Sequence, residues 1–333
     1  MRDRYGREID YLRISVTDKC NLRCRYCMPE DIEAVPMPEI LTFEEIIETV
    51  KAASGLGIRK LKITGGEPLV RRNICNLIRM LKEVNGIEQV TLTTNGILLS
   101  DNIDKLIEAG IDGINVSLDT LDRERYKRLT GYDELDRVLK GISAVLETEI
   151  QVKLNAVSID WGAFSGSQDM LYDTFSLVEY ARDKAIDIRF IELMPIGYGK
   201  DFPGIPHDIL ISAVRERYRG MVRDEAEHGN GPAVYYRIPG YKGSVGFISA
   251  LHGMFCDSCN RIRLTTKGYL KSCLCYDTGA DIKEVLRSGL PDTERRERLC
   301  SVMEEVISGK PGSHCFISEE NISEKSPMSR IGG

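Results

Sequence analysis

Cysteine is the residue type that most directly suggests chemistry in this sequence. The 333-residue chain has ten cysteines. Because disulfide frameworks are typical of short secreted chains, clustered cysteines in a chain of this length favour metal or cluster ligation. Seven of the ten fall into two groups: Cys20, Cys24 and Cys27 near the start, and Cys256, Cys259, Cys273 and Cys275 near the end.

The first group has the spacing C-x3-C-x2-C over Cys20, Cys24 and Cys27. Three thiolates can hold three irons of a [4Fe–4S] cluster and leave the fourth iron open to another ligand. A structural zinc site needs a fourth protein ligand, and this segment contains no histidine and no further cysteine. We therefore expect an iron–sulfur cluster with an open iron at this position.

The second group has the spacing Cys256-x2-Cys259-x13-Cys273. The CxxC pair places two thiolates on one turn, and a hairpin through residues 266–268 could return the chain and deliver Cys273. A second cluster and a zinc site with Cys275 as fourth ligand fit this spacing about equally well. The spacing alone leaves both interpretations open.

Five basic residues have positions that favour phosphate recognition. Arg261 and Arg263 are two apart, so on a strand they share one face, where guanidinium groups can bind phosphate oxygens. Arg13, Lys62 and Lys153 lie in or beside expected strands, where a buried charge is costly unless it is paired or bound to a ligand. Taken singly, each of these three also fits a surface-facing strand position.

The segment TGGEP, residues 64–68, follows an expected strand. Its two glycines allow another backbone segment to approach closely, and Glu67 adds a carboxylate for an ammonium or hydroxyl group. The motif is weak on its own, because a tight strand-to-helix turn can have the same sequence.

The elements that must position these residues alternate along the first 190 residues. The alternation predicts a parallel sheet, and the carboxyl ends of parallel strands carry the active site in such folds. We expect an α/β fold: a partial (β/α)6 TIM-like barrel over 1–200 and an α+β extension over 201–333 that covers the barrel mouth and carries the second cysteine group. A flat doubly wound sheet is the alternative, and 158–172 has no assignable pattern. Strands are expected at 9–17, 58–63, 89–93, 112–118, 150–157 and 186–191, and helices at 42–56, 73–85, 101–109, 134–147 and 174–184.

Composition narrows the possible partners and location. The formal charge of −6 provides no global basic field for nucleic acid. The sequence has no apolar run near 18 residues and no signal-peptide core at its start, so we expect a cytoplasmic protein without a membrane partner.

The segments CNLRCRYC and TGGEP resemble those of the radical S-adenosylmethionine (SAM) superfamily. The resemblance implies that the open iron binds SAM and that one electron cleaves it to a 5′-deoxyadenosyl radical. It also implies four cofactor contacts: Tyr26 and Met194 at the adenine, Gly66 at the methionine amine, and Ser117 at the ribose or carboxylate.

The segment FCDSCNRIRLT, with Cys273 and the ending PMSRIGG, is similar to the GTP 3′,8-cyclase (MoaA) family of molybdenum cofactor synthesis. This likeness implies a second [4Fe–4S] cluster on Cys256, Cys259 and Cys273 that contacts guanine, and a functional Gly332-Gly333 tail. It also implies a low-potential electron donor, a homodimer and a downstream pterin synthase. The GTP contacts that it implies are Arg13, Lys62, Thr93, Lys153, Arg261, the Ile262 backbone and Arg263.

Two other functions are compatible with parts of the sequence. A peptide-modifying radical enzyme would need a peptide groove and usually more auxiliary cysteines. A non-catalytic iron–sulfur or zinc protein would have fully ligated metals and would not cleave SAM.

Overall fold

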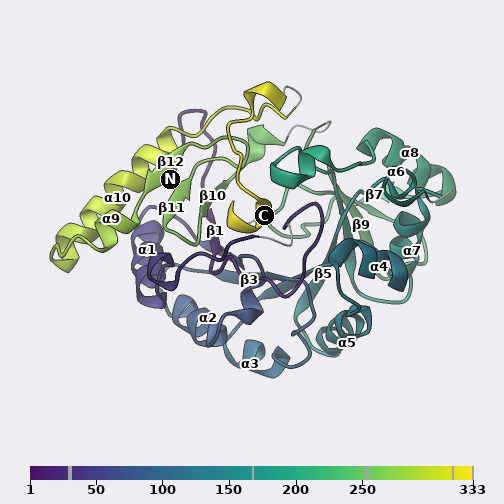
Figure 1. The fold of residues 1–333 in the computed structure, drawn as a ribbon, viewed down its shortest axis with the longest axis horizontal. Helices are drawn as coiled ribbons and strands as arrows, with labels where there is room; N and C mark the ends of the chain where they lie inside the picture. The colour runs from purple at the N-terminus through teal and green to yellow at the C-terminus, as the bar shows by residue number, and fades with distance from the viewer. Residues whose placement is uncertain (29–31, 167–168, 252–254, 317–318, 332–333) are drawn as a thin grey trace.

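A computed structural model describes residues 1–28, 32–166, 169–251, 255–316 and 319–331. Within these residues, twelve strands form one curved sheet with helices on its outer side (Figure 1). The strand order is β12-β11-β10-β1-β2-β3-β4-β5-β6-β9-β8-β7. The strands are β1 Tyr11–Ser15, β2 Lys60–Thr64, β3 Gln89–Thr94, β4 Gly113–Ser117, β5 Gln151–Val157, β6 Asp187–Ile191, β7 Val222–Arg223, β8 Val234–Arg237, β9 Ser244–Ile248, β10 Arg261–Leu264, β11 Tyr269–Lys271 and β12 Gly279–Asp281.

The partial barrel expected from the sequence is confirmed, and its sheet is wider than six strands. Strands β1 to β6 are parallel neighbours in chain order. The C-terminal region adds β9, parallel to β6, at one edge and β10, parallel to β1, at the other. Our sequence interpretation placed the second cysteine group outside the barrel strands. This was wrong for Arg261–Leu264, since β10 belongs to the parallel sheet.

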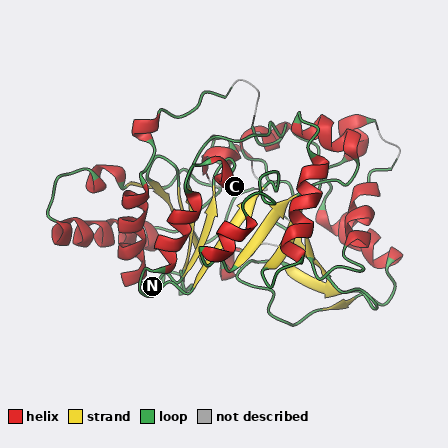
Figure 2. Ribbon diagram, turned by 90° about the horizontal axis from the view of Figure 1, so that it is seen from below, coloured by secondary structure: helices red, strands yellow, loops and turns green. Residues whose placement is uncertain are grey.

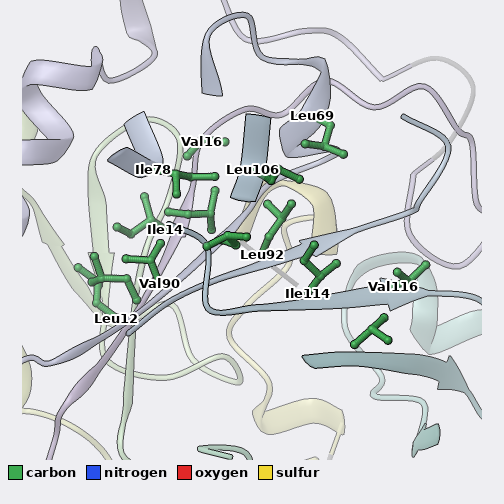
Figure 3. Close-up of a cluster of buried hydrophobic side chains, with 14 of the residues drawn as sticks. Leu12, Ile14, Val16, Leu69, Ile78, Val90, Leu92, Leu106, Ile114 and Val116 are labelled. Carbon is green, nitrogen blue, oxygen red and sulfur yellow. The ribbon is translucent and has the colours of Figure 1, made fainter. Parts of the chain in front are cut away.

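The two faces of the sheet differ in chemistry because side chains alternate along each strand. Leu12, Ile14, Val90, Leu92 and Ile114 lie on the outer face in an apolar cluster, which Figure 3 shows. The alternate positions of the same strands carry polar and charged side chains, which line a cavity on the inner face. A barrel interior is usually filled with apolar side chains, so this polar interior indicates a binding site.

Helices connect the parallel strands and cover the outer face (Figure 2). The Thr42 side chain and Glu45 form a capping box that begins α1. Segment 158–172, which the sequence left unassigned, contains α6, whose N-cap Asp160 accepts from the Ala163 amide. The helices are α1 Phe43–Gly55, α2 Ile74–Lys82, α3 Ile103–Glu108, α4 Arg123–Thr130, α5 Leu135–Leu146, α6 Trp161–Ser165, α7 Tyr172–Tyr180, α8 His207–Arg217, α9 Lys283–Leu286, α10 Asp292–Ser308 and α11 Met328–Ile331.

The C-terminal end of the described chain returns to the barrel mouth. Helix α11 lies over the middle of the sheet in Figure 1, and its residues Met328 and Ser329 line the inner cavity. The expected extension over the mouth is therefore present. No helix among the described residues combines the length and apolar character needed to cross a bilayer.

Candidate active site

One cavity of about 360 Å³ on the inner face of the sheet collects both cysteine groups. The cysteines of the first triad line it from the loop after β1. Those of the second triad line it from the loops that flank the β10–β11 hairpin. The six triad cysteines all line it: Cys20, Cys24, Cys27, Cys256, Cys259 and Cys273.

The loop that carries the first triad is fastened to α4. The amides of Arg23 and Arg25 donate to the carbonyls of Thr130 (2.9 Å) and Leu129 (3.1 Å), which end that helix. Inside the loop, the Cys27 amide donates to the Cys24 carbonyl at 2.9 Å. These bonds fix the loop backbone, so that Cys24 and Cys27 line the cavity.

The glycines of TGGEP permit a close approach to this loop. A Cβ added at Gly66 would lie 2.4 Å from the Lys19 carbonyl oxygen, and one at Gly65 would lie 2.5 Å from the Thr17 carbonyl oxygen. The Gly66 amide donates to that Thr17 oxygen at 2.7 Å. The carbonyl of Gly66 is the group that can accept from an ammonium, in line with the predicted contact to the methionine amine.

Glu67 has a different local role from the one that its motif predicted. Its carboxylate accepts from the Leu69 amide (2.9 Å), the Thr94 hydroxyl (2.8 Å) and the Asn95 amide (2.6 Å), and burial raises its pKa to about 7. The side chain is 1% exposed and is not among the cavity-lining residues. It joins the TGGEP turn to the TTNG turn (93–96), and a direct contact of Glu67 with SAM stays a prediction.

Asn95 links this carboxylate to the first cysteine. Its side-chain nitrogen donates to Asn21 Oδ1 at 2.7 Å and lies 3.8 Å from Cys20 Sγ. Asn95 follows β3 directly and was not predicted as a site residue.

The four predicted contacts of SAM line the same cavity: Tyr26, Gly66, Ser117 and Met194. The Tyr26 hydroxyl donates to Asp119 at 2.8 Å, and the other Asp119 oxygen accepts from the Val157 amide at 2.7 Å. Burial raises the pKa of Asp119 to about 6. Asp119 lies in the loop just after β4 and was not predicted as a site residue.

The second triad surrounds the start and end of the β10–β11 hairpin. The Cys259 amide donates to the Cys256 carbonyl at 3.1 Å, and the turn at Gly268 (φ 89°) returns the chain toward Cys273 as expected. The His314 amide donates to Cys256 Sγ at 3.3 Å. His314 also lines the cavity, and no pattern in the sequence had indicated it.

Cys275 has a partner outside the triad. Its sulfur lies 3.1 Å from Cys315 Sγ and accepts from the Cys315 amide at 3.3 Å. This thiol is fully buried in a small apolar cluster with Ile196 and Phe316. The arrangement supports Cys275 as a residue outside the cluster, although it also lines the cavity wall.

Cations cover much of the remaining cavity wall. Burial lowers the pKa of Arg13 to about 10, and it lowers the pKa values of Lys62 and Arg263 well below their ordinary range. The nearby charges of Arg189 and Arg13 lower the Lys62 pKa further. Such mutual repulsion is relieved when an anion enters, which fits a triphosphate.

Lys153 differs from these cations because it has an acidic partner. Its Nζ lies 3.4 Å from Asp187 Oδ2, and the same oxygen lies 3.1 Å from His228 Nδ1. The GNGP segment, residues 229–232, lines the cavity beside Lys153. Arg189 and Lys310 also line it and were not predicted. Arg189 lies on β6, where a sequence search for buried cations could have found it.

Of the remaining predicted residues, one does not line the cavity and two lie outside the described part of the chain. Arg261 and Thr93 are in the cavity wall, but Ile262 is not, and its side chain belongs to the apolar cluster of the outer face. Its backbone contact with GTP stays a prediction. Gly332 and Gly333 lie outside the described residues.

The thiols fit iron–sulfur clusters chemically. Burial raises the pKa of Cys20 to about 11 and that of Cys27 to about 12, so these groups need bound cations to exist as thiolates. Thiolates are the soft ligands that iron–sulfur clusters use. Among the described residues, no three His, Cys, Asp or Glu side chains are grouped to hold one metal ion. A [4Fe–4S] cluster does not require three ligands around one metal ion, because each thiolate binds a different iron.

Comparisons with known proteins cover the whole chain. The Radical SAM superfamily model matches residues 14–160, and the Molybdenum Cofactor Synthesis C model matches 186–316. A "GTP 3′,8-cyclase" of Clostridium perfringens (strain 13 / Type A) is 42% identical over 334 residues, with both chains fully covered. The chain belongs to the GTP 3′,8-cyclase family. A relative of the same name from Alkaliphilus oremlandii (strain OhILAs) is 41% identical over 335 residues, again with full coverage.

Solved structures support the fold of this family member. The crystal structure of Streptococcus suis SuiB bound to S-adenosylmethionine matches with a TM-score of 0.62 at 16% identity. The match covers 98% of this chain and 76% of that one. At this identity the likeness shows the fold alone.

Proposed function

We propose that this chain is a radical SAM GTP 3′,8-cyclase that catalyses the first step of molybdopterin biosynthesis. It would convert GTP and SAM to (8S)-3′,8-cyclo-7,8-dihydroguanosine 5′-triphosphate, 5′-deoxyadenosine and methionine. The observation that carries the proposal is the single cavity lined by both cysteine triads and by buried cations. When bound, the reduced first cluster and SAM supply a 5′-deoxyadenosyl radical, while the open iron of the second cluster binds guanine.

The residues that line the cavity near the first triad hold SAM. The Gly66 carbonyl accepts from the methionine amine, Ser117 binds the ribose or carboxylate, and Tyr26 and Met194 contact the adenine. The hydrogen bond from Tyr26 to Asp119 fixes the tyrosine ring in the cavity wall. These contacts would hold the cofactor on the first-triad side of the cavity.

The other wall holds GTP. Arg261 and Arg263 lie on the inner face of β10, and Arg263 is the register partner of Arg13, which in turn pairs with Lys62. This row of cations can bind the triphosphate along several strands at once. Thr93 and Lys153 extend the contacts across β3 and β5. Fixing both ends of GTP brings ribose carbon 3′ to the radical, and most of the rate gain comes from that positioning.

Closure of the cavity protects the reaction from water and side reactions. Helix α11 contributes Met328 and Ser329 to the cavity wall. We include Gly332 and Gly333 in the catalytic machinery on their likeness to the family ending. Residues 1–200 act as the radical SAM barrel, and 201–333 act as the auxiliary-cluster and GTP-binding region.

The remaining parts of the proposal concern partners and location. We propose a cytoplasmic homodimer that accepts electrons from a low-potential donor and passes its product to a pterin synthase. The family relationship supports each of these, and separate measurements of oligomeric state and product transfer test them.

The assay for this function uses anaerobically purified protein with a reductant, SAM and either GTP or ATP. We expect 5′-deoxyadenosine and a cyclised nucleotide with GTP, and neither with ATP above background. Zinc in place of iron, or SAM cleavage without any change in GTP, would contradict the proposed function.

A further inference from the structure

The loop that carries the first cysteine triad has a second, outward side. Its cysteines line the inner cavity, whereas Arg23, Arg25 and Met28 line a separate surface hollow. The end of α4 completes that hollow with Lys127, Arg128, Glu124 and Gly131. We refer to these seven residues as the α4 hollow. The hollow and the active-site cavity are therefore on opposite sides of one loop.

The α4 hollow is basic on an acidic protein. Four cations and one carboxylate line it, while the whole chain has a formal charge of −6. Arg25, Lys127 and Arg128 are exposed, and among the described residues none of them forms an ion pair with a carboxylate. Their neighbours on α4 do: Arg123 pairs with Asp133 at 2.8 Å, and Arg125 pairs with Asp173.

Contacts with one aromatic ring hold two of these cations in place. The guanidinium groups of Arg25 and Arg128 lie 5.8 and 5.4 Å from the centre of the Phe164 ring. Lys127 and Arg128 in the last turn of α4 also interact favourably with the helix dipole. The helix dipole accounts for cations at the end of α4, but it does not account for Arg25, which belongs to the loop of the first triad.

We propose that the α4 hollow is the docking surface for an acidic, low-potential electron-transfer protein that reduces the first cluster. This inference rests on the proposed function, which requires one electron per SAM cleaved. The carrier loses one electron, the cluster gains it, and no bond is made or broken in this step. Electron transfer slows steeply with distance, so docking on the outer side of the cluster loop gives a short path. Such encounters use small interfaces, and opposite charges raise their association rate.

The test compares two charge reversals on exposed helix surfaces. Lys127→Glu/Arg128→Glu changes the hollow, and Arg296→Glu/Arg298→Glu makes the same change on α10, on the opposite side of the molecule (Figure 1). Holoenzyme with both clusters is assayed for 5′-deoxyadenosine formation. The reductant is either a reduced acidic ferredoxin or photoreduced deazaflavin.

We expect the α4 variant to lose at least about tenfold in rate at limiting ferredoxin and to lose the salt dependence of that rate. Its rate with deazaflavin should stay within twofold of the parent. The α10 variant should match the parent with both reductants. Equal ferredoxin rates in all three proteins would overturn the docking site. Failure of the parent with deazaflavin would count against the proposed function instead.

A single change at the loop provides a second, independent measurement. Arg25→Gln removes one cation and adds no negative charge. We expect it to lower the rate at limiting ferredoxin by a smaller factor, with an unchanged iron content of the holoenzyme. A ferredoxin rate equal to that of the parent, with iron content also unchanged, would contradict the proposal.

Discussion

Arg13 on β1 and Lys62 on β2 are register partners, and both side chains line the inner cavity. Placing two like charges side by side in a barrel interior destabilises the empty protein. The arrangement becomes favourable when a polyanion binds. The Arg13–Lys62 pair therefore favours binding of a polyanionic substrate inside the barrel.

Lys62→Met should weaken GTP binding and stabilise the ligand-free protein. Removing a charge-assisted hydrogen bond to phosphate should raise the KM for GTP about tenfold to a hundredfold. Because burial lowers the Lys62 pKa, the lysine opposes folding at neutral pH, and this opposition decreases as the pH rises from the lowered pKa to the pKa of an unfolded lysine. Thermal unfolding without GTP checks the second part. A variant with a lower Tm and unchanged KM would contradict both.

Gly66→Ala should displace the first-cluster loop. The added Cβ would meet the Lys19 and Asp18 carbonyl oxygens at 2.4 and 2.7 Å. A shift of that size near the reacting atoms should lower SAM cleavage about a hundredfold. Gly55→Ala at the end of α1 is the matched control, because nothing lies within 4 Å of its added Cβ. Equal activity of the two variants would show that the close approach is unimportant.

Glu67→Gln should change how stability depends on pH. The folded carboxyl has a pKa of about 7, against 4.5 for the ordinary value, so the folded state keeps a proton that the unfolded state releases between these pH values. Its contribution to stability is present below pH 4.5 and is lost as the pH rises through 7, a change on the order of 3 kcal/mol.

Denaturant unfolding of parent and variant at pH 5 and pH 7.5 checks this prediction. Between these two conditions the free energy of unfolding should change in favour of the glutamine variant. Glu83→Gln, at an exposed position after α2, should show no such change relative to the parent. Parallel pH profiles for the parent and the Glu67 variant would contradict the assignment.

Cys273→Ser and Cys275→Ser should differ in iron content. Two [4Fe–4S] clusters correspond to about eight irons per chain. The Cys273 variant should lose about half of them, since a ligand of the second triad is removed. The Cys275 variant should keep all of them, because its thiol contacts Cys315. Loss of iron from the Cys275 variant would make that residue a ligand.

The local part of the fold was predictable, and its long-range part was not. Alternating strand and helix patterns gave the six strands from β1 to β6, because each connection is short and local. The sequence does not indicate that residues 11–14 pair with residues 261–264, since nothing local records a partner 250 positions away. Helix α4 was missed because RERYKRLT has too few apolar residues to show a helical stripe.

The candidate site was likewise predictable where it depends on local sequence, and not where it depends on contacts between distant segments. The cysteine spacings, the basic strand positions and the family motifs indicated many of the residues that line the cavity, although Glu67 and Ile262 do not line it. The roles of Asp119, Asn95 and His314 depend on contacts between separate loops. The contact of Cys275 with Cys315 likewise joins positions 40 apart in the chain, which spacing alone does not reveal.

The position of hydrogen removal tests the central claim most directly. Holoenzyme is incubated with a reductant, SAM and GTP that carries deuterium at ribose carbon 3′. The mass of the 5′-deoxyadenosine formed is then measured by mass spectrometry. A cavity that holds GTP between the two clusters predicts 5′-deoxyadenosine one mass unit heavier than with unlabelled GTP. Unlabelled 5′-deoxyadenosine, formed at the same rate, would contradict the account.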